Sequence, residues 1–191
     1  MTQPQLKLFM VLMGANVPGR NVELHDYFFG IAPTLKDLLP SIKAAWPEAG
    51  TSLHLDGWRE VNSVDGYRVS VRLKSESLVV NNDRLFFINL GGYQQGKLEE
   101  QHYTLLTVQD DKKPAAKEAM KTLFYHQNSF RGAHSHIDER FGVDVDDMYR
   151  VDDILPAGDK EQYQILIELA EGLAEDTIHL GYFKLSALNF G

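Results

Sequence analysis

The sequence predicts an α+β protein in which two tandem β-β-α-β-β units share a mainly antiparallel sheet, with helices on one side of it. Two observations lead to this prediction. The two halves of the chain resemble each other, and strand-like and helix-like patterns follow in the same order in both halves. The composition is that of a globular protein, because 43% of the 191 residues are hydrophobic and 24% are charged.

The first stretch of similarity appears when the sequence is shifted so that Leu8 falls on Leu85. Six positions are then identical, among them a glutamate and a histidine two residues apart. The identical residues of the first copy are Leu8, Phe9, Gly14, Gly19, Glu23 and His25, and their counterparts are Leu85, Phe86, Gly91, Gly96, Glu100 and His102.

A second stretch appears after a slightly longer shift that places His54 on His136. The residues His54, Asp56, Val61, Asp65, Tyr67, Arg68 and Val69 then match His136, Asp138, Val143, Asp147, Tyr149, Arg150 and Val151. Because self-similarity in register is the signature of an internal repeat, we predict a tandem duplication whose copies pair around a pseudo-two-fold axis. We expect a first repeat over residues 1–80, a second over 81–156, and a C-terminal hairpin over 157–191 that completes the sheet of one compact domain.

The first elements of each copy follow from local patterns. The apolar run Leu8–Met13 predicts a buried strand, and the glycine- and proline-containing stretch 14–20 predicts a loop. A run rich in aromatic residues predicts a second strand over 26–32.

A helix should follow the second strand. Thr34 is a suitable N-cap, apolar residues recur at helical spacing from Leu35 to Trp46, and Pro40 predicts a kink. In the second copy we expect the corresponding helix to begin at Pro114.

Two more strands are predicted over 53–61 and 67–73, where apolar and polar residues alternate on either side of an Asp-Gly turn. After the second copy, the stretches 163–169 and 178–185 also have strand patterns. We therefore expect these last two stretches to pair with each other as the closing hairpin.

Charge and composition exclude several classes of function. The net charge of −8 disfavours a general nucleic-acid-binding protein, which needs the opposite sign. The chain has no cysteine, so it has no disulfides, thiolate metal sites or cysteine nucleophile, and this fits a reducing compartment. The run Leu8–Met13 is too short to span a bilayer and no cleavage site follows it cleanly. We therefore expect a cytoplasmic protein with no membrane partner.

Several motifs of the first copy are shared with a known family. They are Leu8–Gly14, Gly19-Arg20, Glu23–Asp26 with Phe29-Gly30, Leu35–Trp46, and His54-x-Asp56-x-Trp58 with Asp65-Gly66-Tyr67. In these motifs the chain resembles a bacterial family known only as a domain of unknown function, numbered 1543, whose short module often occurs twice in one chain. The second copy departs from the motifs at Arg140, where the family has Trp, and at Tyr103, where it has Asp. The resemblance implies a related fold and no activity, because none is assigned to the family.

The two Glu-x-His pairs are the first candidate site. Residues two apart on a strand project from the same face, so Glu23 with His25, and Glu100 with His102, can share a proton, bind a metal or contact a polar ligand. The alternative is that both histidines are hydrogen-bonded residues at a strand edge that fix the preceding loop.

The second candidate is formed by His54 with Asp56 and by His136 with Asp138. In the first copy Trp58 should join the same face. Direct pairing of a histidine with an aspartate along one strand is geometrically poor, so a structural role is favoured here. In that role Asp56 forms a cross-strand salt bridge with Arg68, and Asp138 forms one with Arg150.

A metal site is a third possibility, because His134, His136 and Asp138 place three potential ligands on one face. The first copy has Ser52 where the second has His134, and the residue after Asp138 is Glu139 instead of His, which weakens this interpretation.

Three hypotheses for the function remain open. The first is a binding module for a small polar ligand or a protein partner, which uses the duplicated His, Glu and Asp residues, with no cofactor assigned. The second is a metal-assisted hydrolase that uses His134, His136 and Asp138 with Glu100 or His102. The third is a structural or self-associating protein, and a homo-oligomer is compatible with the sequence. If the two Glu-x-His pairs converge near the pseudo-two-fold axis, one ligand can contact both copies.

Overall fold

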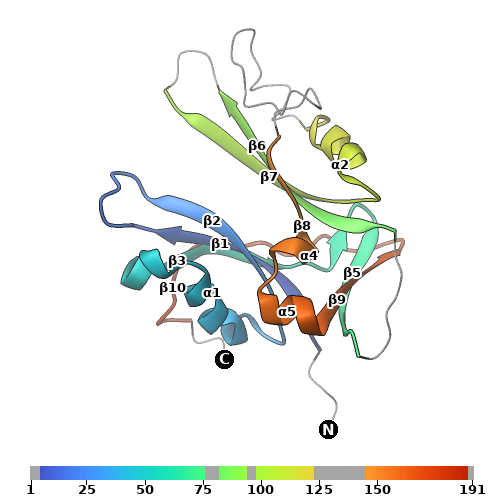
Figure 1. Cartoon of the computed structure of the whole chain (residues 1–191), viewed down its shortest axis with the longest axis horizontal. Helices are drawn as coiled ribbons and strands as arrows, with labels where there is room; N and C mark the ends of the chain where they lie inside the picture. The colour runs from blue at the N-terminus through green and yellow to red at the C-terminus, as the bar shows by residue number, and fades with distance from the viewer. Residues whose placement is uncertain (1–4, 76–81, 94–97, 123–144, 189–191) are drawn as a thin grey trace. The chain divides into compact units, whose positions relative to one another are not determined.

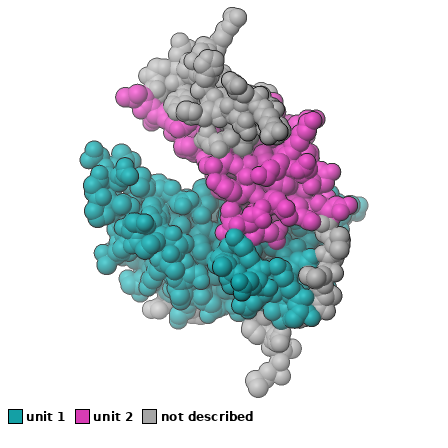
Figure 2. All heavy atoms as spheres, in the orientation of Figure 1, with its two compact units in different colours: residues 1–79, 155–191 teal, residues 80–154 magenta. Residues whose placement is uncertain are grey.

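The computed structural model describes residues 5–75, 82–93, 98–122 and 145–188 (Figure 1). The chain forms two compact units. Unit 1 consists of Met1–Val79 with Leu155–Gly191, and unit 2 consists of Val80–Ile154 (Figure 2).

Unit 1 is built on a four-stranded antiparallel sheet with the order β10-β3-β1-β2. Its strands are β1 (Lys7–Ala15), β2 (Leu24–Ala32), β3 (His54–Glu60) and β10 (His179–Lys184). Alternate residues of β1 from Phe9 to Ala15 are buried on one face of this sheet, in the main hydrophobic core. The opposite face carries the polar residues discussed below.

Short helices cover the core face of this sheet. A 3₁₀ turn η1 (Leu35–Leu38) leads into α1 (Leu39–Ala45), and η2 (Pro47–Ser52) leads to β3. The predicted helix is thus present but divided at the expected place, since Pro40 lies in the first turn of α1, where its missing N–H is tolerated. The carboxylate of Asp37 accepts hydrogen bonds from the N–H and the hydroxyl of Thr34, at 3.1 and 2.6 Å, which fixes the helix start.

A second sheet of unit 1 has the order β4-β5-β9. It contains β4 (Ser63–Val64), β5 (Tyr67–Leu73) and β9 (Tyr163–Leu169), and α5 (Ala157–Gln162) precedes β9. Asp65 and Gly66 form the β4–β5 turn, both with positive φ, as an Asp-Gly hairpin turn requires. The predicted closing hairpin is wrong, because β9 pairs with β5 whereas β10 pairs with β3.

Unit 2 contains a three-stranded antiparallel sheet with the order β7-β6-β8. The strands are β6 (Arg84–Tyr93), β7 (Glu100–Gln109) and β8 (Val145–Arg150), and the helices are α2 (Lys112–Ala119) and α4 (Val151–Ile154). Helix α2 begins two residues before the expected Pro114, after the N-cap Asp111. The α+β class is confirmed. The single shared sheet is wrong, because the described strands form three separate sheets.

The predicted repeat can be compared with the strand pairing inside each unit. Gly14 faces His25 across β1 and β2, and Gly91 faces His102 across β6 and β7, as the first shift requires. The second shift aligns Trp58 with Arg140, but the strand pairing in the two units aligns Trp58 with a different residue. Trp58 faces Val11 of the central strand, and the residue in the equivalent position of unit 2 is Met148. The second shift is therefore wrong as a structural alignment, and the duplication itself stays a prediction.

Candidate functional site

Three neighbouring strands place two histidines on either side of a glycine. Strand β1 continues to Ala15, beyond the predicted end at Met13, so that Gly14 lies inside the sheet. Gly14 faces His25 on β2 and His54 on β3. Cross-strand neighbours project from the same face of a sheet, so both imidazole rings lie on the face opposite the hydrophobic core.

A β-bulge brings an acidic residue between the two rings. Leu12 faces Gly57 and Met13 faces Leu55, so Asp56 is the extra residue of β3. A bulge re-aims its side chain, and here the carboxylate of Asp56 contacts both histidines. Its Oδ1 lies 3.2 Å from Nε2 of His54, and its Oδ2 lies 3.1 Å from Nε2 of His25.

Glu23 adds a second carboxylate to this group. Its Oε1 lies 3.1 Å from Nε2 of His54, and the side-chain amide of Asn16 donates a hydrogen bond to the same oxygen at 3.4 Å. The four residues Glu23, His25, His54 and Asp56, which we call the His–carboxylate cluster, therefore meet in one place. Sequence reasoning listed all four as candidates but assigned them to two separate sites.

The ring of His54 is held in one orientation. The side chain is 1% exposed, its ring lies 4.2 Å from the ring of Tyr182 between centroids, and its Nδ1 lies 2.9 Å from the carbonyl oxygen of Ser52. A carbonyl oxygen accepts hydrogen bonds and cannot donate them, so we assign the proton to Nδ1. In the neutral ring Nε2 then presents a lone pair to the carboxylate oxygens of Glu23 and Asp56.

Two buried polar atoms of the cluster lack a hydrogen-bond partner within the described residues. They are Nε2 of His54 and Oδ2 of Asp56. The nearest carboxylate and imidazole atoms lie at ion-pairing distances of 3.1 to 3.2 Å, but these contacts are not hydrogen bonds as the side chains stand. Buried polar groups in folded proteins are almost always satisfied, so these two atoms are the points of the cluster at which a further partner can be accommodated.

The backbone at Gly14 leaves room for the cluster. A Cβ atom at this position would lie 2.4 Å from Oδ2 of Asp56 and 2.5 Å from Nε2 of His54. Both distances are far below van der Waals contact, so no other residue fits without displacing the cluster. Gly14 was expected to be part of a loop, and sequence reasoning therefore missed its role, together with those of Ser52 and Tyr182.

Solvent reaches the cluster from one side. The side chains of His25, Glu23 and Asp56 are 47%, 36% and 24% exposed, whereas His54 is buried beneath them. A small ligand can thus meet both carboxylates and the imidazole of His25 at the surface.

Two expectations for this region are wrong. Trp58 does not join the face of His54 and Asp56, because the bulge reverses the alternation and Trp58 packs against the hydrophobic core. Asp56 does not form the expected salt bridge with Arg68, since Arg68 belongs to β5 in the other sheet of unit 1, where it faces Glu168.

The second Glu-x-His pair lies in unit 2 and is more loosely arranged. Nε2 of His102 is 3.9 Å from Oε2 of Glu100, and its Nδ1 is 3.3 Å from the side-chain amide of Asn89. His102 is half exposed. A pocket shared by the two Glu-x-His pairs stays a prediction, as no contact within either unit tests it.

The remaining predicted site residues, His134, His136 and Asp138, lie outside the described residues, and so does the expected salt bridge of Asp138 with Arg150. In the described ranges, no group of three or more His, Cys, Asp or Glu side chains can hold a metal ion as the side chains stand. No helix in those ranges is both long and apolar enough to cross a membrane.

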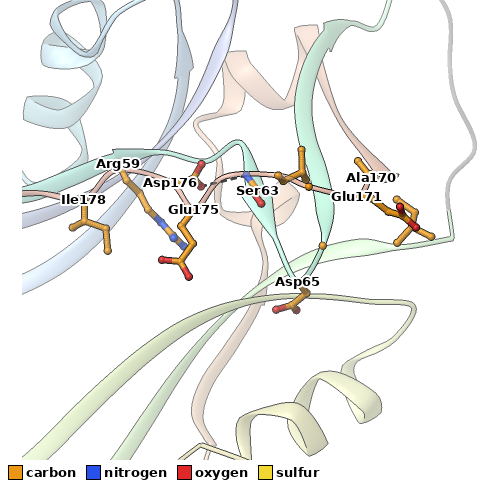
Figure 3. Close-up of a pocket in the computed structure, with 12 residues that line it drawn as sticks. Arg59, Ser63, Asp65, Ala170, Glu171, Glu175, Asp176 and Ile178 are labelled. Atoms are coloured by element: carbon orange, nitrogen blue, oxygen red, sulfur yellow. Dashed lines mark hydrogen bonds between the residues drawn. The ribbon is translucent and has the colours of Figure 1, made fainter.

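A separate cavity of about 660 Å³ lies between the β4–β5 turn and the segment that follows β9 (Figure 3). It is lined by Arg59 and by several acidic residues, of which Asp176 accepts hydrogen bonds from the backbone N–H groups of Asn62 and Ser63 at 3.0 to 3.3 Å. Asp176 therefore has a structural role. The cavity contains no histidine and shares no residue with the His–carboxylate cluster.

Two carboxyl groups outside the cluster have raised pKa values. Burial raises the pKa of Asp159, whose carboxylate accepts a hydrogen bond from the N–H of Ile31 at 2.9 Å, and this bond opposes the rise. Burial also raises the pKa of Asp152 in unit 2, against the lowering effect of Arg150 and Arg84. Neither group contacts the His–carboxylate cluster.

Comparison with known proteins shows what the chain resembles. Residues 20–71 match the family described as Domain of Unknown Function (DUF1543). This segment contains all four residues of the cluster, and the match confirms the resemblance to DUF1543 over it. A solved structure, a protein Il1583 from Idiomarina loihiensis, is 25% identical, with a TM-score of 0.62 over 94% of this chain and 98% of that one. No curated protein matches, so the comparisons assign no activity.

Proposed function

We propose that the protein is a binding module for a small cationic ligand, bound by the His–carboxylate cluster of unit 1. The observation that carries the proposal is the buried Nε2 of His54, which lies 3.1 and 3.2 Å from two carboxylate oxygens without a hydrogen-bond partner. With Nδ1 committed to Ser52, a ring that carries a single proton adds a third acceptor to the two carboxylates. Acceptors that converge in this way are stabilised by a positive charge or a donor placed among them.

The charge around the cluster supports a cationic ligand. Glu23 and Asp56 carry two negative charges, and the whole chain has a net charge of −8. Lys184 is the cross-strand neighbour of His54, but it is exposed and forms no ion pair in the described part of the chain. The same charge disfavours nucleic acid and anionic lipid surfaces as partners. A cytoplasmic location is part of the proposal, and the cysteine-free composition supports it.

The competing interpretation is a structural one, and it rests on the burial of His54. If His54 is an imidazolium, it can donate to Glu23 and Asp56 without any ligand, and the cluster then only ties β2 to β3. The two interpretations differ in their response to added cations, because a purely structural cluster has no vacant acceptor.

Thermal denaturation of the untagged protein with separate additions of ZnCl₂, MgCl₂, ethylammonium chloride and sodium phosphate tests the proposal. A cation present at about 100 times its Kd should add about 2.7 kcal/mol of stability. The Glu23→Gln and Asp56→Asn variants should lose this stabilisation. The matched control is Glu60→Gln, which removes a carboxylate of the same unit that pairs with Lys7 outside the cluster.

A stabilisation that the three variants share equally would contradict the proposal, and so would stabilisation by phosphate alone. If no cation raises the melting temperature, the structural interpretation holds.

A further inference from the structure

We propose that the ligand of the His–carboxylate cluster is a divalent transition-metal ion, with Nε2 of His54, Nε2 of His25 and the carboxylates of Asp56 and Glu23 as its ligands. This inference rests on the proposed function and names the class of cation. Two imidazoles and two carboxylates form the mixed nitrogen and oxygen set that zinc and its neighbours in the first transition row prefer.

Taken in pairs, Nε2 of His54 and each of the two carboxylate oxygens near it are spaced as neighbouring ligands of such an ion. Metal–nitrogen and metal–oxygen bonds of about 2.1 Å that join atoms 3.1 and 3.2 Å apart make an angle of roughly 95–100° at the metal. That angle lies between octahedral and tetrahedral geometry. An organic ammonium group needs about 2.8 Å to each acceptor, so these donor atoms are too close together to surround it.

The environment of His54 is the second observation. A histidine that binds a metal through Nε2 almost always donates its Nδ1–H to a carbonyl or carboxylate, which fixes the tautomer and the ring orientation. Here Nδ1 faces the carbonyl oxygen of Ser52 at 2.9 Å, and the ring is packed against Tyr182. Nε2 of His54 and Oδ2 of Asp56, which are buried without a hydrogen-bond partner, are then the atoms that a metal would satisfy.

Binding requires a change in side-chain position. As the side chains stand, the described residues include no three ligands that can hold a metal ion together. His54 is fixed by its surroundings, so the groups that must move are the imidazole of His25 and the carboxylate of Glu23. These are the two most exposed side chains of the cluster, at 47% and 36%, and their rotation needs no rearrangement of the sheet.

The donor set also predicts selectivity. Mg²⁺ and Ca²⁺ bind oxygen ligands, and only the carboxylates of the cluster supply them. We therefore expect binding of Zn²⁺ or Co²⁺ at one ion per chain and at least tenfold weaker binding of Mg²⁺.

Isothermal titration of ZnCl₂ into untagged, chelator-treated protein tests the inference. We expect one site per chain, and at least a tenfold loss of affinity in His25→Gln and in His54→Gln. The matched control is His179→Gln, which removes an exposed histidine of unit 1 that stacks on Trp58 outside the cluster and should leave the affinity unchanged. Circular dichroism identifies variants that fail to fold. If His54→Gln is among them, the half-exposed His25 still tests the inference.

Each other outcome has a definite meaning. If ethylammonium chloride stabilises the protein and zinc does not bind, the metal inference is overturned and the proposed function stands. If neither binds, both are overturned. If zinc binds and the site is lost in a His134→Gln/His136→Gln variant instead of in His25→Gln, the inference is overturned in favour of the metal site suggested by the sequence.

Discussion

Replacing Gly14 by alanine should disrupt the His–carboxylate cluster with a change of one methyl group. The new Cβ would lie 2.4 Å from Oδ2 of Asp56 and 2.5 Å from Nε2 of His54. Since carbon and oxygen or nitrogen atoms do not approach closer than about 3.0 Å without strain, both side chains, or the backbone of β1 at this point, must shift by about half an ångström. His54 cannot move freely, as its ring is buried and its Nδ1 is bound to Ser52. The added methyl group should therefore displace Asp56 and force His54 out of its fixed position at a cost in stability.

The expected cost is that of overpacking, about 1–3 kcal/mol. For a chain of this size that lowers the melting temperature by about 2–12 °C. The assay is thermal denaturation followed by circular dichroism, together with the zinc titration described above. Zinc affinity should fall with stability, because the clash displaces two proposed ligands.

Gly158→Ala is the matched control. Gly158 lies in α5, and the nearest atom to its added Cβ is Nε2 of Gln162, at 4.0 Å. Alanine there should leave stability unchanged or raise it by up to about 1 kcal/mol. If Gly14→Ala melts with the wild type and binds zinc equally well, the described geometry of the cluster is wrong.

Three further predictions concern stability. Burial raises the pKa of Asp159, so the ionised form of this side chain opposes folding as pH rises above about 4. Asp159→Asn keeps an acceptor for the Ile31 N–H, and in thermal melts at pH 7 it should be as stable as the wild type or more stable, with the difference vanishing at low pH. A variant less stable than the wild type at pH 7 would contradict this. Thr34→Ala should lower the free energy of unfolding, measured by urea denaturation, by about 1 kcal/mol, because the Thr34–Asp37 contacts fix the start of η1. An unchanged free energy of unfolding would show that these contacts are dispensable. Lys7→Ala should have a smaller effect, below about 1 kcal/mol in the same assay, because the Lys7–Glu60 ion pair at 2.7 Å is about one-third exposed, and a larger loss would mean that this pair is not screened by solvent.

Sequence patterns were sufficient to predict the position of those strands and turns that depend on neighbouring residues alone. The apolar run that begins at Leu8 and the Asp65-Gly66 turn depend on burial and backbone conformation of nearby residues, and both lie where the patterns place them. The α+β class and the approximate strand positions follow from such signals. Pairing between distant strands carries no local signal, which is why β9 and β10 were expected to pair with each other.

The candidate site shows the same limit. The spacing of His54 and Asp56 correctly placed this pair on one strand, whereas of the first pair only His25 lies in β2 and Glu23 immediately precedes that strand. The two pairs are brought together by a bulge opposite Leu12 and Met13, and the sequence of β3 contains no pattern that predicts this bulge. Because a bulge inverts the alternation beyond it, the prediction for Trp58 failed together with the salt bridge expected for Asp56.

The most direct measurement of the central claim is an NMR titration of the imidazole nitrogens of the protein's seven histidines with ZnCl₂. We expect the Nε2 resonances of His25 and His54 to shift together and saturate at one zinc ion per chain, while Nδ1 of His54 remains protonated. If these two resonances stay in place while those of His134 and His136 shift, or if no histidine responds, the assignment of the His–carboxylate cluster as a transition-metal site is contradicted.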